Sequence, residues 1–268
     1  MKFKSPWLVK PNSSFRLSEI DPGTKNGVGS SGEAAAILAK HRDQLAKLQE
    51  VLYAGQQRAV LIVLQGMDTA GKDGTISRIF SGINPQGCDV TSFKVPTSME
   101  ARHDFLWRCH IAAPAKGIIG VFNRSYYEDV LAPRVHKLIS SKEVRRHLDE
   151  INGFENMLND NGTLVLKFFL HLSRDEQKRR LQARLDNPEK HWKFSDGDLK
   201  ERQFWPQYQA AYEDILSHTS RKHAPWFVIP ADHKPFRDVT ISRILVDALS
   251  ALKLTYPKPT MDVSKIKL

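Results

Sequence analysis

The residues best suited to chemistry form a glycine-rich segment, GMDTAGKDG, at positions 66–74. It follows an apolar run, precedes a helical pattern and has the G-x-x-x-x-G-K spacing of a phosphate-binding loop. Glycines let the backbone curl until its N–H groups face an anion, the start of a helix adds positive potential, and Lys72 neutralises charge. The predicted phosphate-binding residues of this loop are Gly66, Ala70, Gly71, Lys72, Asp73 and Gly74.

One residue departs from the usual loop. Asp73 stands where a Ser or Thr hydroxyl normally binds magnesium. A metal ion would therefore need other oxygen ligands, and Asp68 is the candidate, either directly or through a coordinated water. The structural alternative is a glycine turn in which Asp73 only caps the following helix. The intact spacing favours the functional interpretation.

Polar residues also follow a second apolar run, in the segment VFNRSYYED at 121–129. The carboxyl ends of parallel strands face the ligand in open α/β sheets. We therefore expect Asn123 to orient metal-bound water, Arg124 to hold the phosphoryl group in transfer, and Glu128 to reach a second metal ion or the acceptor. The structural alternative is a polar cap in which Arg124 and Glu128 form an ion pair.

A third segment, from Lys178 to Arg202, holds eight cationic and five anionic side chains. Arg180 and Arg184 are four residues apart on one predicted helix face, where they repel each other unless an anion lies between them. Pro188 then breaks the helix. The pattern predicts a mobile, anion-facing lid over about residues 174–202, and a solvated charged helix is the alternative.

The elements that must position these residues alternate between strand and helix. Apolar runs typical of buried parallel strands occur at 59–65, 90–95, 118–123, 164–170 and 226–229. Three intervening helical patterns begin with the capping boxes Thr97/Glu100, Ser140/Glu143 and Ser173/Glu176. This order predicts an α/β protein with a five-stranded parallel sheet, helices on both faces, and a ligand site beyond the carboxyl ends of the strands.

Composition and charge narrow the class of protein. The chain has 268 residues, 41% hydrophobic and 26% charged, which excludes disordered and collagen-like classes. It carries 40 Lys plus Arg against 30 Asp plus Glu, a net charge of +10, so the expected partner is a polyanion. The sequence shows no apolar stretch near the ~20 residues that span a bilayer, no signal-peptide pattern, and only two cysteines. We therefore expect a cytoplasmic protein without a membrane partner.

The sequence divides into three parts. Residues 1–32 are rich in Pro, Gly, Ser and Asn, which predicts an N-terminal surface arm. A helical pattern begins at Glu33 and ends at Gly55, so we place a single P-loop domain at 33–254. Residues 255–268 form a C-terminal tail.

Three segments taken together resemble the family-2 polyphosphate kinases: GMDTAGKDG at 66–74, FNRSYYED at 122–129 and RLDNPEKHWKF at 184–194. The similarity extends from about Glu33 to about Leu254. The resemblance implies a thymidylate-kinase-like P-loop kinase domain with a helical lid. It also implies phosphoryl transfer between inorganic polyphosphate and nucleoside mono- and diphosphates, with Mg²⁺ as cofactor and Mn²⁺ as the alternative ion. Tetramers occur in this family, so the resemblance implies a homo-oligomer.

The resemblance assigns roles to individual residues. Lys72 and Arg124 would contact the phosphate in transfer, and Asp68 would serve the magnesium ions. The position of Asn123 and Glu128 after the strand, apart from the resemblance, adds Asn123 as a second metal ligand, directly or through water, and Glu128 as the last member of the predicted catalytic set. The lid residues that would bind polyphosphate are Arg184, Lys190 and Lys193. The predicted nucleotide-binding residues are Asn123, Tyr127 and Glu128.

Asn123 also bears on the choice of acceptor. Family members that handle diphosphates carry Asp at this position, whereas the pattern NRSxYED resembles the subgroup that phosphorylates both mono- and diphosphates. Glu128 would supply negative charge near the acceptor in place of the missing carboxylate. We therefore expect conversion of AMP to ADP and then to ATP, with guanine nucleotides as further acceptors.

The expected mechanism is direct, in-line transfer. A nucleotide's terminal phosphate oxygen is already anionic near neutral pH, so the obstacle is repulsion between two anions, which Lys72, Arg124 and Mg²⁺ would neutralise. The reaction should be reversible, since one phosphoanhydride replaces another. Two alternatives stay open: an ATP-dependent nucleoside or nucleotide kinase and, less well supported, an NTPase stimulated by nucleic acid. The sequence shows no motif that reads RNA or DNA, so no nucleic-acid partner is expected.

Overall fold

A computed structural model describes residues 3–25, 27–194, 196–262 and 266. Its described residues form one sheet of five parallel strands in the order β2-β3-β1-β4-β5. The strands are β1 (Ala59–Gln65), β2 (Cys88–Ser92), β3 (Ile119–Asn123), β4 (Thr163–His171) and β5 (Trp226–Pro230). The prediction of a five-stranded parallel sheet is confirmed.

The position of β2 differs from the predicted 90–95. The strand ends at Ser92, and Val95 lies outside it with 87% of its surface exposed. A strand that is buried on both faces is expected to be a continuous apolar run. This expectation does not apply to β2, because β2 is an edge strand and its Val90 is half exposed. Apolar content alone therefore placed this strand too late in the chain.

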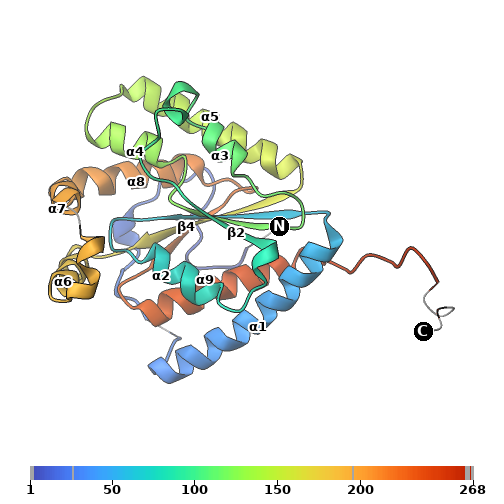
Figure 1. The fold of residues 1–268 in the computed structure, drawn as a ribbon. Helices are drawn as coiled ribbons and strands as arrows, with labels where there is room; N and C mark the ends of the chain where they lie inside the picture. The colour runs from blue at the N-terminus through green and yellow to red at the C-terminus, as the bar shows by residue number, and fades with distance from the viewer. Residues whose placement is uncertain (1–2, 26, 195, 263–265, 267–268) are drawn as a thin grey trace.

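Helices cover both faces of the sheet, as predicted (Figure 1). One layer holds α1 (Ser31–Gly55), α2 (Lys72–Ile79) and α9 (Lys234–Ser250), and the other holds α3 (Trp107–Ile111), α4 (Glu128–Val135), α5 (Ser141–Asp160) and α8 (Trp205–Thr219). At one end of the sheet lie α6 (Arg174–Leu185) and α7 (Asp196–Gln203). The short 3₁₀ turns are η1 (Leu17–Glu19), η2 (Pro85–Gly87), η3 (Glu100–Arg102) and η4 (Pro188–Lys193).

The predicted capping boxes differ in outcome. Ser140 and Glu143 exchange both bonds at the start of α5, as expected. Thr97 and Glu100 also bond reciprocally, but they begin only the 3₁₀ turn η3. At α6, Ser173 accepts from the backbone N–H of Glu176, while the Glu176 carboxylate binds two arginines of its own helix instead of returning to Ser173.

A charged pair lies inside the core on one face of the sheet. Lys167 of β4 and Glu155 of α5 have no exposed side-chain surface, and their Nζ and Oε2 atoms are 2.6 Å apart. The hydroxyls of Tyr126 and Tyr127 donate to Glu155 at 2.8 and 2.9 Å. The Lys167 ammonium also donates to the Tyr127 hydroxyl and to the carbonyl of Thr219. Hydrogen bonds thus compensate these buried charges.

The described part of the N-terminal arm packs on the body. Leu8 forms an antiparallel bridge with Phe227, and the N–H of Val9 donates to the carbonyl of Trp226 at 2.9 Å. Val9 and Leu17 are buried. The arm therefore covers the β5 edge of the sheet and is more than the surface segment expected from its Pro and Gly content.

The C-terminal tail leaves the body. Its described residues, 255–262 and 266, are exposed, and Figure 1 shows them extending away from α9. No helix in the described ranges combines the length and apolar character that a membrane span requires.

Candidate active site

The phosphate-binding loop joins β1 to α2, as predicted. Gly66 and Gly71 have φ values of 151° and 102°, and a Cβ on Gly71 would lie 2.1 Å from Nη1 of Arg237. Glycine is required there because the conformation and the close contact both exclude a side chain. Lys72 begins α2, and its ammonium donates to the carbonyl of Gly66 at 2.6 Å. Burial and the nearby Arg124 lower the pKa of Lys72.

Asp73 and Asn123 meet across the site. The Asn123 amide donates to Oδ1 of Asp73 at 2.7 Å and reaches the Ser92 hydroxyl at 3.4 Å. Asp73 thus binds the residue that ends β3. The contact of Asn123 with Ser92 joins the carboxyl ends of the neighbouring strands β3 and β2, the edge at which a ligand of an open α/β sheet binds.

Arg124 reaches the loop from the end of β3. Its backbone is left-handed, with φ of 64°, and its N–H donates to the carbonyl of Leu64. The guanidinium donates to Oδ1 of Asp68 at 2.7 Å, so Arg124 forms its ion pair with Asp68 and not with Glu128. The alternative of a closed Arg124–Glu128 cap is therefore wrong in its pairing, and Arg124 stays at the cavity wall.

Glu128 and Tyr127 have different environments. Glu128 begins α4 and lines a cavity, and burial raises its pKa despite the nearby Arg124 and Lys72. Tyr127 is fully buried, with its hydroxyl bonded in the Glu155–Lys167 pair, and it lines neither of the two cavities described below. The structure therefore corrects the expectation that Tyr127 contacts a nucleotide.

Two cavities meet at this edge of the sheet. The first has a volume of about 880 Å³ and is lined by eleven Lys or Arg side chains against three Asp side chains. The second, of about 540 Å³, mixes apolar side chains such as Leu131 and Pro133 with five carboxylates and the rings of Tyr208 and Tyr212. Five residues line both cavities: Asp68, Phe93, Lys94, Arg124 and Asp198. A strongly cationic space thus opens on a mixed space of nucleotide size.

The comparisons with known proteins decide the family. A model of the polyphosphate kinase 2 family matches residues 29–257. The chain belongs to this family. It is 49% identical over 261 residues to an AMP/ADP-polyphosphate phosphotransferase of Meiothermus ruber, which covers 97% of this chain and 98% of that protein. It is 47% identical to an ADP-polyphosphate phosphotransferase of Rhodopseudomonas palustris, covering 84% of this chain and 82% of that one.

A solved structure agrees with the sequence relatives. The crystal structure of polyphosphate kinase 2 from Arthrobacter aurescens TC1 superposes with a TM-score of 0.92 at 44% identity, covering 96% of this chain and 92% of that chain. Together with the parallel sheet and the loop after β1, this match confirms the P-loop α/β fold of a polyphosphate kinase 2 protein.

The predicted lid segment divides into two parts in this polyphosphate kinase 2 chain. Lys190, Lys193 and Arg184 line the first cavity, and Arg184 donates to the carbonyl of Lys193 and to Asp198. Arg180 is instead 7% exposed and bonded within the protein. The inference that Arg180 and Arg184 repel unless an anion separates them is wrong, because each has its own oxygen partners.

Several side chains of the cavities escaped sequence reasoning. In the first cavity they include Arg78, Lys94, Lys234 and Arg237, and in the second Arg108, Asp129, Tyr208 and Tyr212. Most come from α3, α8 and α9, outside the segments that carry the motifs. Only Asp129 lay inside a segment that the sequence singled out.

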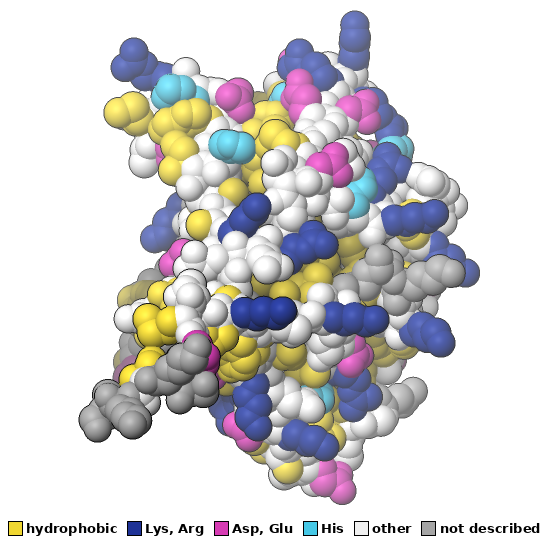
Figure 2. All heavy atoms as spheres, turned by 90° about the vertical axis from the view of Figure 1, so that its right-hand side faces the viewer, with side chains coloured by type: hydrophobic (Ala, Val, Ile, Leu, Met, Phe, Trp, Pro, Cys, Tyr) yellow, Lys and Arg dark blue, Asp and Glu magenta, His cyan; other side chains and the backbone are white. Residues whose placement is uncertain are grey.

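Positive charge is not confined to the cavities. Figure 2 shows the face on the right-hand side of Figure 1, and Lys and Arg side chains outnumber Asp and Glu there as well. Such a net charge attracts polyanions from a distance. What distinguishes the first cavity is therefore its enclosure beside the phosphate-binding loop.

The donor set at the cavity boundary fits a magnesium ion. Mg²⁺ in phosphoryl-transfer sites is held by one or two carboxylates, with waters and substrate phosphates completing its shell. Asp68 and Asp198 both line the boundary between the cavities. Within the described ranges, no three His, Cys, Asp or Glu side chains form a ready-made metal site. This arrangement suits an ion that shares its ligands with a phosphate substrate.

Proposed function

We propose that this protein transfers the terminal phosphoryl group of inorganic polyphosphate to AMP and ADP, with guanine nucleotides as further acceptors. The observation that carries the proposal is the pair of cavities that meet at Asp68 and Arg124. The relatives named above as AMP/ADP- and ADP-polyphosphate phosphotransferases support the choice of substrates. A GDP-polyphosphate phosphotransferase of Pseudomonas aeruginosa, 35% identical over 198 residues, supports the guanine acceptors.

The cationic cavity favours polyphosphate over ATP as the donor. Eleven Lys or Arg side chains line it, whereas a nucleoside needs mainly apolar and aromatic walls. Among the described residues that line it, the aromatic side chains are Phe93 and Trp192, and Trp192 is 78% exposed. The second cavity has the apolar walls and the aromatic rings that an acceptor nucleoside requires. An ATP-dependent kinase would need two such nucleoside sites.

The side chains divide the catalytic work between them. Lys72 and the N–H groups of the loop hold the phosphate in transfer, and Arg124 reaches it from the acceptor side because it lines both cavities. Asp68 and Asp198 at the boundary of the cavities, with Asn123 beside them in the first cavity, are the residues that would hold Mg²⁺, which would supply charge neutralisation between donor and acceptor phosphates. The reaction is direct and reversible, since the acceptor oxygen is already anionic and one phosphoanhydride replaces another.

The test is transfer without ATP. Purified protein is incubated with Mg²⁺, long-chain polyphosphate and either AMP or ADP, and the products are separated by chromatography. We expect ADP and ATP from AMP, and ATP from ADP, with loss of both in Lys72→Ala and on chelation of the metal. Transfer from ATP with none from polyphosphate would establish the ATP-dependent kinase instead. Product from ADP alone would refute acceptance of monophosphates.

A further inference from the structure

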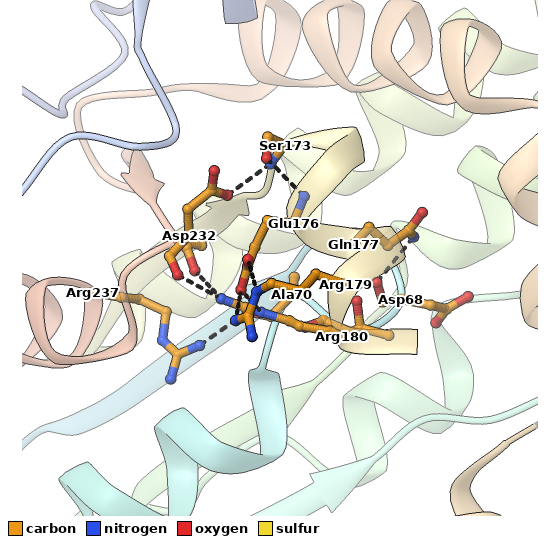
Figure 3. Close-up of polar contacts among 11 residues, drawn as sticks. Asp68, Ala70, Ser173, Glu176, Gln177, Arg179, Arg180, Asp232 and Arg237 are labelled. Atoms are coloured by element: carbon orange, nitrogen blue, oxygen red, sulfur yellow. Dashed lines mark hydrogen bonds and ion pairs between the residues drawn. The ribbon is translucent and has the colours of Figure 1, made fainter. Parts of the chain in front are cut away.

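The carbonyl groups of the phosphate-binding loop are held by side chains from distant elements (Figure 3). Gln177 of α6 donates to the carbonyl of Asp68 at 3.1 Å, and Arg180 of α6 donates to that of Thr69 at 3.0 Å. The carbonyl of Ala70 accepts from both Arg180, at 3.1 Å, and Arg237 of α9, at 3.0 Å. Three consecutive carbonyls are thus fixed from outside the loop.

Arg180 makes the largest share of these contacts. Its Nη1 donates to the two loop carbonyls, its Nη2 donates to the carbonyls of Ala231 and Asp232 at 2.6 and 3.0 Å, and its Nε donates to Glu176 at 2.7 Å. A guanidinium has five N–H groups, and all five are used here. Although Arg180 lines the cationic cavity, it has no N–H left for a phosphate.

The contacts of Arg180 tie three parts of the chain together. They join α6 to the loop after β1 and to the turn after β5, and the carboxylate of Asp232 in that turn accepts from the N–H of Ser173 at the start of α6. The loop needs such support because Thr69 has a left-handed backbone with φ of 67°. Carbonyls held outward leave the loop N–H groups to face the phosphate.

We propose that Arg180 is a positioning residue that holds the phosphate-binding loop in its anion-binding conformation, and that it does not bind polyphosphate. The proposal deepens the function proposed above and rests on it only for the reaction that the loop serves. The proposal gives Arg180 a different role from Arg184, although Arg184 lies one turn further along the same helix and lines the same cavity.

The kinetic test uses Arg180→Lys, which keeps the charge but has at most three donors. We expect kcat to fall about 10- to 100-fold, as a shift of the loop by a fraction of an ångström would cause. The KM for polyphosphate should stay within about threefold of the wild-type value. Arg243→Lys, an exposed position on α9, is the matched control and should leave both constants unchanged. An unchanged kcat with a raised KM for polyphosphate would make Arg180 a phosphate ligand and overturn the proposal.

A second measurement does not depend on activity. Amide hydrogen exchange of residues 66–72 should become faster in Arg180→Lys, while exchange in α5 stays at the wild-type rate. Faster exchange in both regions would mean that Arg180 stabilises the whole fold. Unchanged exchange in residues 66–72 would mean that Arg180 does not position the loop. Either result overturns the proposal. If the wild-type protein transfers no phosphate, the function proposed above fails while the exchange measurement still tests the role of Arg180.

Discussion

The buried pair of Lys167 and Glu155 gives a sharp prediction about stability. Replacing Lys167 by Met keeps much of the side-chain volume but removes the ammonium that lies 2.6 Å from the Glu155 carboxylate. It also leaves the carbonyl of Thr219 without the donor that Lys167 supplies. Removing one partner of a fully buried pair leaves an uncompensated charge, so we expect a loss of about 3–5 kcal/mol in the free energy of unfolding.

The loss of unfolding free energy in Lys167→Met should grow as the pH rises. Burial lowers the pKa of Lys167 to about 8, from an ordinary value of 10.5. Between these values the unfolded state binds more protons than the folded state, so the contribution of Lys167 to stability rises with pH. From pH 7 to pH 9 this rise amounts to about 1 kcal/mol.

Urea unfolding followed by far-UV circular dichroism, at fixed protein concentration, measures both effects. Lys142→Met is the matched control, because Lys142 lies exposed on α5, the helix that carries Glu155. We expect that control within about 0.5 kcal/mol of the wild type. A cost below about 1 kcal/mol for Lys167→Met, or a cost that shrinks as pH rises, would refute the reasoning.

Three further predictions concern the site. Gly71→Ala places a Cβ 2.1 Å from Nη1 of Arg237 in a backbone with φ of 102°. Thermal unfolding should therefore show that the free energy of unfolding falls by about 1–3 kcal/mol. The control Gly153→Ala, with open space around its Cβ, should leave the free energy of unfolding unchanged or raise it. Asn123→Asp replaces the amide that binds the loop carboxylate, so transfer to AMP should fall relative to transfer to ADP; an unchanged ratio of the two kcat/KM values would contradict this. Because burial raises the pKa of Glu128, its carboxylate gains a proton at a higher pH than an ordinary glutamate does. The ratio of wild-type to Glu128→Gln kcat/KM for AMP should therefore decline as the pH falls through that raised pKa, and a ratio independent of pH would count against an ionised Glu128.

The sequence predicted the parts of the site that are local in the chain. The loop at 66–74 carries its own signal, because its glycines are required by the backbone and its lysine follows at a fixed spacing. The polar residues after β3 were predicted from the rule that strand ends face the ligand, and Arg124 and Asn123 lie there. These predictions depend on contacts within a few residues or on one fold-level rule.

The failures share a different cause. Arg180 and Arg184 look alike in sequence, yet the structure buries one among carbonyls and leaves the other at the cavity. Tyr127 sits in a motif, but its ring turns to a pair formed by residues 28 and 40 positions away. The direction in which each of these side chains points depends on tertiary contacts of α5, α6 and β5. A local sequence pattern contains no information about those contacts.

The arm that covers β5 has a consequence for how the chain folds. The N–H of Val9 bonds to Trp226 and that of Val228 bonds to the carbonyl of Trp7, so the first residues of the chain meet partners more than 200 positions later. Contacts of such long sequence separation form slowly, because a large loop must close first. During synthesis the arm cannot dock until β5 has left the ribosome, and the β5 edge of the sheet stays open to other strands until that moment. Emergence of β5 from the ribosome, not of the phosphate-binding loop, therefore determines when the arm can complete the fold.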